Sequence, residues 1–340
     1  MKPLNIAGID IAPGSSHQID LPVVRLYTDS EVTMPVYVKR ARKDGPTVFV
    51  SAAVHGDELN GIEIIRRLIQ SKSLKLRCGS IIFVPMVNVY GVLNQSRYMP
   101  DRRDLNRVFP GSDKGSLAGR LAHIFLDEIV SKCDYGIDLH TGAIHRTNLP
   151  QIRANLDDQQ TRELAEEFGV PVLLNANLRD GSLREAAVEY GVKILLYEAG
   201  EALRFDELSI RAGVKGIENI LRALQMLAKK RSRKRRIEPF VAYKSSWVRS
   251  GASGIVRDHV SIGDHVQKGA LLATIGDAFG ETLARVVSVR EGVVIGKQNI
   301  PLVQEGDAMF HIAYFRDSED VSDNIEELNE ALLNPGEAPL

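Results

Sequence analysis

The sequence predicts an α/β fold followed by a smaller, all-β, barrel-like domain. From Met1 to Ala228, short apolar runs typical of strands alternate with stretches whose apolar residues recur at helical spacing. Seven basic residues in eight then follow, at Lys229–Arg236, and from Ile237 to Phe315 the pattern changes to short β-runs separated by glycines. These changes predict a first domain over residues 1–235, a β-rich domain over 236–315 and an acidic tail over 316–340.

The composition is that of an ordinary soluble globular protein. Hydrophobic residues at 44% and charged residues at 26% are ordinary for a soluble domain, and the net charge of -1 gives no reason to expect a nucleic-acid or membrane partner. No apolar run approaches the roughly 20 residues that cross a bilayer. Cys78 and Cys133 suggest no disulfide framework, so we expect a cytoplasmic protein. The basic run stands without interleaved aromatic residues, which favours a helix end and linker over a nucleic-acid-binding segment.

The elements of the first domain follow from local patterns. Four short, aliphatic or β-branched runs, each followed by a break, predict core strands at Thr47–Ala53, Ser80–Pro85, Tyr135–Leu139 and Lys193–Tyr197. Apolar spacings of three and four predict helices at Gly61–Ser71, Leu117–Cys133, Asp158–Phe168, Ser182–Tyr190 and Ser209–Ala228. Asp158 and Ser182 are helix starts, and Gly169 and Gly191 are stop signals.

The second domain has Gly-Asp pairs before apolar residues, as at Gly263-Asp264 and Gly306-Asp307, which suit tight turns between strands. This segment resembles the biotinyl/lipoyl-type β-barrel module. It lacks the lysine turn that such carriers modify, so a structural or site-capping role is the better interpretation.

Two histidines and a carboxylate predict a metal site. His55 and Glu58 lie three residues apart where an apolar run turns into a helix, and Gly56 lets the backbone bend there. His140 closes another apolar run, and strand ends of an open α/β sheet cluster in space. Two imidazoles, a carboxylate and one open position are what catalytic zinc takes, so we expect one Zn²⁺ per chain. Asp104 and Asp138 are candidate carboxylate partners for the outer N–H groups of these histidines, with capping or turn roles as the alternative.

The remaining chemistry needs a base and anion anchors. Glu198 ends the apolar run Ile194–Tyr197, where a partly desolvated carboxylate can activate a zinc-bound water. Arg107 offers a fork of donors for a substrate carboxylate. Arg97, Arg102 and Arg103 add positive charge nearby, and one of them could polarise a scissile carbonyl.

Four ordered motifs, His-Gly-Asp-Glu, Asp-Leu-Asn-Arg, Asp-Leu-His-Thr-Gly and Tyr-Glu-Ala-Gly, resemble the succinylglutamate desuccinylase/aspartoacylase family, a branch of the zinc carboxypeptidase superfamily. The resemblance implies a mixed β-sheet flanked by helices and carrying one zinc. It also implies roles for ten residues: zinc ligands His55, Glu58 and His140; general base Glu198; substrate-carboxylate residues Asn106 and Arg107; acidic partner Asp104; carbonyl-polarising Arg97, with Arg103 as rival; and a further substrate residue, Arg184. The segments around His145–Pro150 and Arg179–Gly181 do not match the named enzymes of the family, so the narrow substrate stays open.

The sequence thus predicts a zinc-dependent deacylase that hydrolyses the amide bond of an N-acylated amino acid or similar small carboxylate. Two alternatives stay open: a metallocarboxypeptidase with the same ligands, and a non-catalytic binding module on the same fold. Homo-oligomerisation stays open as well, because nothing in the sequence indicates it.

Overall fold

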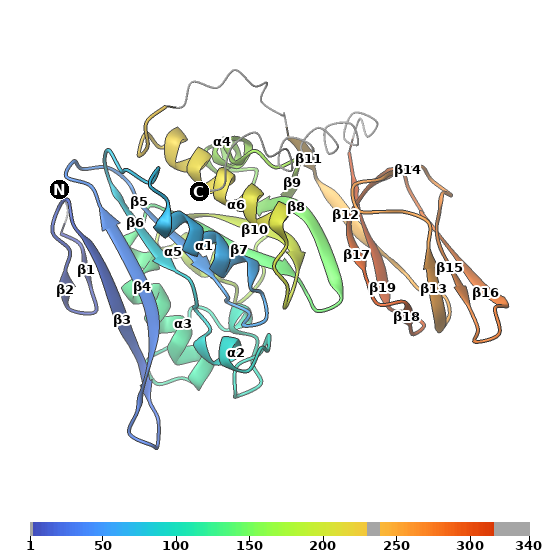
Figure 1. Cartoon of the computed structure of the whole chain (residues 1–340), viewed down its shortest axis with the longest axis horizontal. Helices are drawn as coiled ribbons and strands as arrows, with labels where there is room; N and C mark the ends of the chain where they lie inside the picture. Colours follow the sequence, from blue (N-terminus) through green and yellow to red (C-terminus); the bar gives the residue numbers. More distant parts are fainter. Residues whose placement is uncertain (1–2, 230–238, 316–340) are drawn as a thin grey trace.

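The computed structural model describes residues 3–229 and 239–315 (Figure 1). The basic run beyond Lys229, the predicted boundary at residue 235 and the predicted acidic tail lie outside the described residues. Among the described residues, no helix is both long and apolar enough to cross a membrane.

A 13-stranded mixed sheet forms the centre of the molecule. Its middle consists of four parallel strands in the order β10, β7, β5, β6. These are the predicted core strands: β5 (Thr47–Ala52), β6 (Ser80–Val84), β7 (Tyr135–Gly142) and β10 (Lys193–Glu201). The last two extend beyond their predicted ends, because β7 and β10 keep pairing with each other through His140 and Glu198. His140 and Glu198 therefore lie within strands.

Four strands of this sheet were not predicted from the sequence. A long antiparallel hairpin of β3 (Ser16–Arg25) and β4 (Glu31–Arg40) continues the sheet beyond β6. On the other side, β8 (Arg146–Ala154) pairs with β10, and β9 (Val172–Asn175) pairs with β8. A separate short hairpin, β1 (Asn5–Ile6) and β2 (Ile9–Asp10), begins the described chain.

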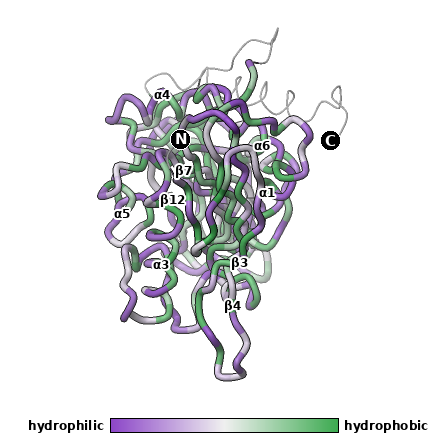
Figure 2. Tube along the Cα trace, turned by 90° about the vertical axis from the view of Figure 1, so that its left-hand side faces the viewer, coloured by the Kyte–Doolittle hydropathy of each residue, from purple (hydrophilic) through white to green (hydrophobic). Residues whose placement is uncertain are grey.

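Helices cover both faces of the sheet, which confirms the predicted layer structure (Figures 1 and 2). The helices are α1 (Asn60–Gln70), α2 (Val89–Leu93), α3 (Leu117–Glu128), α4 (Gln159–Phe168), α5 (Leu183–Glu189) and α6 (Glu207–Ala223). Asp158 and Ser182 cap α4 and α5 as predicted, and Gly169 ends α4 at a φ of 88°. The helix predicted over Leu117–Cys133 is shorter, because the backbone leaves helical geometry at Ile129 before a separate 3₁₀ turn, Val130–Lys132.

Alternating strand residues supply two hydrophobic cores. Val48 and Val50 of β5 pack with α1, α4 and α6, whereas Phe49 between them packs with α3 and α5. Figure 2 shows the green, hydrophobic strands with α3 and α5 on one side and α1 and α6 on the other. The central strands are therefore packed on both faces, up to the carboxyl ends that carry the candidate site.

The C-terminal segment is all-β, as predicted, and it joins the large sheet. Its strands are β11 (Phe240–Ala242), β12 (Lys244–Arg249), β13 (Gly254–Asp258), β14 (His265–Val266), β15 (Leu271–Gly276), β16 (Thr282–Val287), β17 (Gly292–Gln298), β18 (Leu302–Val303) and β19 (Ala308–Tyr314). Strand β17 pairs with β8 and β11 pairs with β9, while β13, β15, β16 and β18 form their own four-stranded sheet. The C-terminal strands thus extend the sheet that carries the candidate site.

Candidate active site

The candidate site lies at the carboxyl ends of β5, β7 and β10. His55 and Glu58 occupy the turn between β5 and α1, and His140 lies in β7. Glu198 of β10 stands in register with His140. Parallel strands present their carboxyl ends at one edge of a sheet, which brings these side chains together from distant parts of the sequence.

The turn that carries His55 and Glu58 depends on Gly56. A Cβ atom added to Gly56 would lie 1.9 Å from the backbone carbonyl carbon of Gly91 in α2. We expect Gly56→Ala to lower the free energy of unfolding by about 3 kcal/mol, because backbone rather than a flexible side chain would have to move. Urea denaturation would measure this loss. Gly251→Ala is the matched control, since a Cβ there meets nothing within 4 Å; an equal effect in both variants would contradict the argument.

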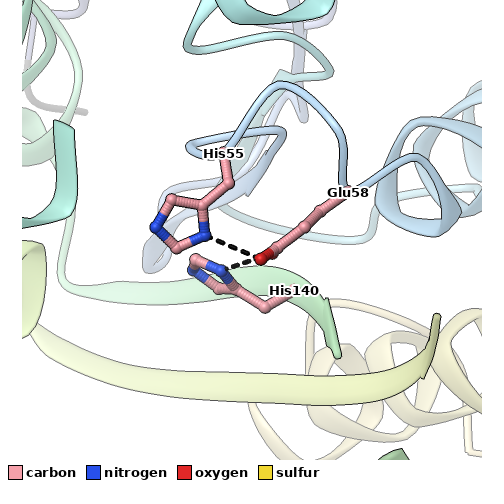
Figure 3. Close-up of side chains that lie close together, drawn as sticks. All are labelled: His55, Glu58 and His140. Carbon is pink, nitrogen blue, oxygen red and sulfur yellow. Dashed lines mark hydrogen bonds and ion pairs between the residues drawn. The ribbon is translucent and has the colours of Figure 1, made fainter. Parts of the chain in front are cut away.

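His55, Glu58 and His140 form a buried group whose ligand atoms lie within 4.8 Å of one another. Nδ1 of His55 lies 2.7 Å from Oε1 of Glu58, and Nδ1 of His140 lies 2.8 Å from Oε2. Figure 3 shows both rings turning a nitrogen toward this one carboxylate. The outer nitrogens also contact carboxylates: Nε2 of His55 lies 3.2 Å from Asp104, and Nε2 of His140 lies 2.7 Å from Asp138.

The charges of this group fit a divalent cation. Burial disfavours a charged imidazole, but the carboxylates of Asp138 and Glu58 outweigh it and raise the pKa of His140 well above its ordinary value. The same balance, with Glu58 and Asp104, raises the pKa of His55. With both rings neutral, the three carboxylates and the contacting Arg97 carry a net charge of −2. A divalent cation facing the Nδ1 atoms and Glu58 would balance that charge and leave each outer N–H to donate to an aspartate, which is the common pattern around zinc.

Arg97 joins this group, and Arg103 does not. The Arg97 guanidinium contacts Oδ2 of Asp104 at 2.9 Å and Oε1 of Glu58 at 3.4 Å. Burial disfavours the Arg97 cation, yet Glu58 and Asp104 raise its pKa. The Arg103 side chain is 57% exposed and lies 3.8 Å from Asp101. It does not line the cavity that opens over His55, Glu58 and His140. Of the two rivals for polarising a carbonyl, only Arg97 contacts the candidate metal-binding group.

A cavity of about 850 Å³ opens over this group. Its wall includes Asn106, Arg107, Arg184 and Glu198, so the structure brings the other predicted site residues into one space. The side-chain oxygen of Asn106 accepts a hydrogen bond from the Leu183 amide, at 2.9 Å, which fixes the loop at the start of α5. Arg184 donates to the carbonyls of Ala176 and Asn177, and burial lowers its pKa to about 10.

Glu198 is held by two residues that the sequence analysis did not single out. Asn148 Nδ2 donates to Glu198 Oε2 at 2.8 Å, and the Arg153 guanidinium contacts the same oxygen at 3.1 Å. Both come from β8, and Glu198 stands in register with Gln151 of that strand. Gln151 and Arg153 alternate with the apolar residues Ile152 and Ala154, which is a weak local signal of a strand beside Glu198.

The C-terminal strands close the far side of the cavity. Trp247 of β12 lines the wall and stacks on His311 of β19, with ring centroids 4.7 Å apart and planes inclined by 8°. The Arg146 guanidinium lies 5.2 Å from the centre of the Trp247 ring. The site-capping role expected for this segment is thus consistent with its position.

His311 makes the stability of this wall pH-dependent. Burial, together with the charges of Arg153 and Arg179, lowers the pKa of His311 from 6.5 to about 3. Below pH 6.5 the unfolded chain binds a proton that the folded chain does not, so stability falls as the pH drops from 6.5 toward 3.

We expect the free energy of unfolding to fall by roughly 1–2 kcal/mol more in the wild type than in His311→Phe between pH 7.5 and pH 5. Phenylalanine keeps a ring against Trp247 but cannot titrate. Urea denaturation at the two pH values measures the difference, and parallel pH slopes in the two proteins would refute this role.

The comparisons with known proteins agree with this architecture. The model of the succinylglutamate desuccinylase/aspartoacylase catalytic domain matches residues 44–224. A curated N-alpha-acetyl-L-2,4-diaminobutyric acid deacetylase of Halomonas elongata is 30% identical over 298 residues, covering 83% of this chain and 86% of the relative.

Two solved structures share the fold over nearly their whole length. The succinylglutamate desuccinylase/aspartoacylase of Rhodobacter sphaeroides is 25% identical, with a TM-score of 0.77 over 88% of this chain and 96% of the other. The product-bound ectoine utilisation protein EutE (DoeB) of Ruegeria pomeroyi is 24% identical, with a TM-score of 0.79 over 92% and 98%.

Fold and site together define an α/β protein with a candidate metal-binding group at the carboxyl ends of parallel strands and a cavity above it. The chain belongs to the succinylglutamate desuccinylase/aspartoacylase family. The family expected from the four motifs is thereby confirmed, as is the mixed sheet flanked by helices.

Proposed function

We propose that this protein is a zinc-dependent deacylase that hydrolyses the amide bond of an N-acylated amino acid. The observation that carries the proposal is that Glu198 pairs in register with His140 and lines the same cavity as His55, Glu58 and His140. The curated relative, named as a deacetylase of an N-acetylated diamino acid, supports the same class of amide.

His55, Glu58 and His140 would hold the zinc ion. Bound there, zinc would polarise the acyl carbonyl and make the attacking water more acidic. The donor set is that of catalytic rather than structural zinc, since three side chains leave a position open.

Glu198 and Arg97 carry out the proton transfer and the charge stabilisation in this reaction. Glu198 takes one proton from the attacking water as its oxygen bonds to the acyl carbon, and delivers it to the nitrogen as the C–N bond breaks. Arg97 donates to the acyl oxygen, where negative charge develops. The second proton of the water leaves with the acyl product, which ionises to a carboxylate, and the other product is the free amino acid.

Arg107 and Asn106 hold the substrate carboxylate in this proposal. We expect Arg107→Gln to raise KM by roughly 10- to 100-fold with a smaller change in kcat, because a contact made equally in the ground and transition states affects binding. Steady-state kinetics on an N-acetyl amino acid measures both constants. A fall in kcat at constant KM would instead place Arg107 at the reacting atoms.

Metal content and turnover test the proposed function together. We expect plasma emission to find one zinc per chain, and mass spectrometry to detect amino acid release from a panel of N-acetyl and N-succinyl amino acids. Chelation should abolish release, and added zinc should restore it. Release from peptides alone would favour a carboxypeptidase. No bound zinc, and no uptake on titration, would overturn the proposal in favour of a binding module.

A further inference from the structure

The four-stranded sheet of the C-terminal segment has one packed face and one open face. Alternate residues of its strands, such as Ile275 and Val286, enter a hydrophobic core that this sheet shares with β12 and β19. The residues between them point to the other side, and Figure 1 shows β13, β15 and β16 at the end of the molecule away from the helices. We call this other side the outer face; among the described residues, no element covers it.

The outer face carries a group of exposed apolar side chains. Ile255 of β13 and Leu302 of β18 are register partners, and they are 48% and 59% exposed. Only Gly276, which has no side chain, separates Ile255 from β16 in the register of the sheet. Leu283 of β16 and Phe279, in the turn before it, are exposed as well. Single apolar residues on a surface are ordinary, but a group on one sheet face indicates a contact surface.

The same face carries two arginines without counter-ions. Arg257 of β13 and Arg285 of β16 are both exposed, and both are register partners of Thr274 in β15, so the three residues form one row across the sheet. Asp258, the one carboxylate in these four strands, forms its ion pair with Lys297 of β17 instead. Among the described residues, no carboxylate forms an ion pair with either arginine. The outer face therefore fits a partner that is both apolar and acidic.

The acidic tail, residues 316–340, has a sequence of that kind. It contains eight carboxylates and one arginine, so its net charge is strongly negative. Apolar residues recur within it at Val321, Ile325, Leu328 and Leu332, the spacing that gathers side chains on one side of an amphipathic helix. A short segment of this kind gains most of its helical stability from a surface that covers its apolar side.

The tail begins close to the outer face. Tyr314, two residues before it, packs against the core beneath the four-stranded sheet. The Arg290 guanidinium lies 5.6 Å from the centre of the Tyr314 ring, and Arg290 follows β16 by three residues. The chain from Phe315 to Val321 spans up to roughly 20 Å when extended, against the roughly 10 Å between two packed sheets. The tail can therefore reach the outer face of its own chain.

We propose that the acidic tail docks on the outer face of the four-stranded sheet of the same chain. The four apolar residues of the tail pack on the exposed apolar group, and Arg257 and Arg285 attract the tail carboxylates. The basic run Lys229–Arg236 is the main competitor for the tail, but it consists of lysines, arginines and one serine. It offers charge without apolar surface, so it would leave the apolar residues of the tail uncovered. The inference is independent of the proposed function, because the residues of the outer face do not line the cavity.

Hydrogen exchange read by mass spectrometry on the full-length chain tests the docking from the side of the tail. We expect the amides of residues 321–333 to exchange roughly 10-fold or more slowly than in a synthetic peptide of that sequence, because docking orders them. Arg257→Glu combined with Arg285→Glu should return exchange to within about threefold of the peptide. Lys72→Glu combined with Arg120→Glu is the matched control, since both residues are exposed in the first domain and the net charge changes equally. This control should keep the protection.

Hydroxyl-radical footprinting tests the docking from the side of the sheet, and it leaves the sheet itself unchanged. The full-length double variant Ile325→Ser with Leu328→Ser keeps the charge of the tail but removes half of its recurring apolar residues. We expect oxidation of the exposed apolar group to rise by roughly threefold or more in this variant, most clearly at Phe279. Oxidation equal to that of the wild type would contradict the docking.

Other locations for the tail give different results. Exchange of the wild-type tail at the rate of the free peptide would mean that it docks nowhere. Protection that survives Arg257→Glu with Arg285→Glu would place the tail on another surface, such as the basic run, and overturn the inference. Analytical ultracentrifugation should find the same oligomeric state in the wild type and in both double variants. A dimer that either variant dissociates would place the tail on a second copy of the chain and refute docking within one chain.

Discussion

Replacing Glu198 with glutamine is expected to lower kcat by roughly 10²–10⁴-fold, the usual contribution of a general acid–base residue. Glutamine has the same shape and can still accept from Asn148, but it cannot take a proton from water. The loss should therefore appear in kcat, with zinc content close to that of the wild type. Steady-state kinetics and plasma emission on the same preparation measure both.

Glu201→Gln provides the control for this variant. Glu201 lies in the same strand, β10, but contacts Asn299 and the His145 amide outside the cavity wall. Its replacement should leave kcat within a few-fold of the wild type. Full activity in Glu198→Gln, or loss of zinc from this variant, would show that Glu198 is not the general base.

Replacing His140 with alanine is expected to abolish both zinc binding and turnover. The substitution removes one of the three proposed ligands and also leaves Asp138, which is fully buried, with Ser51 as its remaining hydrogen-bond partner among the described residues. Breaking a buried charged contact from one side costs about 3–5 kcal/mol, so the melting temperature should fall as well.

Zinc content, turnover and thermal melting would be compared with those of His259→Ala. His259 is exposed beside the C-terminal four-stranded sheet and contacts Thr274. That control should retain zinc and activity. One zinc per chain in His140→Ala would mean that the metal binds elsewhere.

The central strands were predictable from sequence because they are buried on both faces. Val48-Phe49-Val50 is apolar throughout, and each of its residues packs into one of the two cores. Strand β8 has the opposite character. Its sequence, Arg146–Ala154, contains Pro150 and several polar residues, so it is more typical of a loop than of a strand. Long-range pairing with β10 and β17 determines its structure, and no local pattern records that pairing.

The polar residues that made β8 difficult to predict as a strand also made part of the candidate site difficult to predict. The candidate metal-binding group stood out because His55, Glu58 and His140 follow apolar runs and match short motifs. Asn148 and Arg153, which hold Glu198, belong to no such motif, and Trp247 comes from the segment with a carrier-like pattern. The segments around His145 and Arg179, whose sequences do not match the named enzymes of the family, contribute residues to the cavity wall. Sequence motifs located the proposed chemistry, whereas tertiary pairing shapes the space for the substrate.

The pairing of β17 with β8 has a consequence for how the protein is made. A growing chain that has just emerged through β10 already contains His55, Glu58, His140 and Glu198, but the β8 edge that β17 later covers is still open. An uncovered strand edge is a template for pairing with another chain, and contacts between distant parts of the sequence form slowly. Translation must reach β19 before the cavity gains its last wall. The nascent protein therefore passes through a stage in which its proposed metal ligands are present, the cavity is unfinished and the strand edge is open to neighbouring chains.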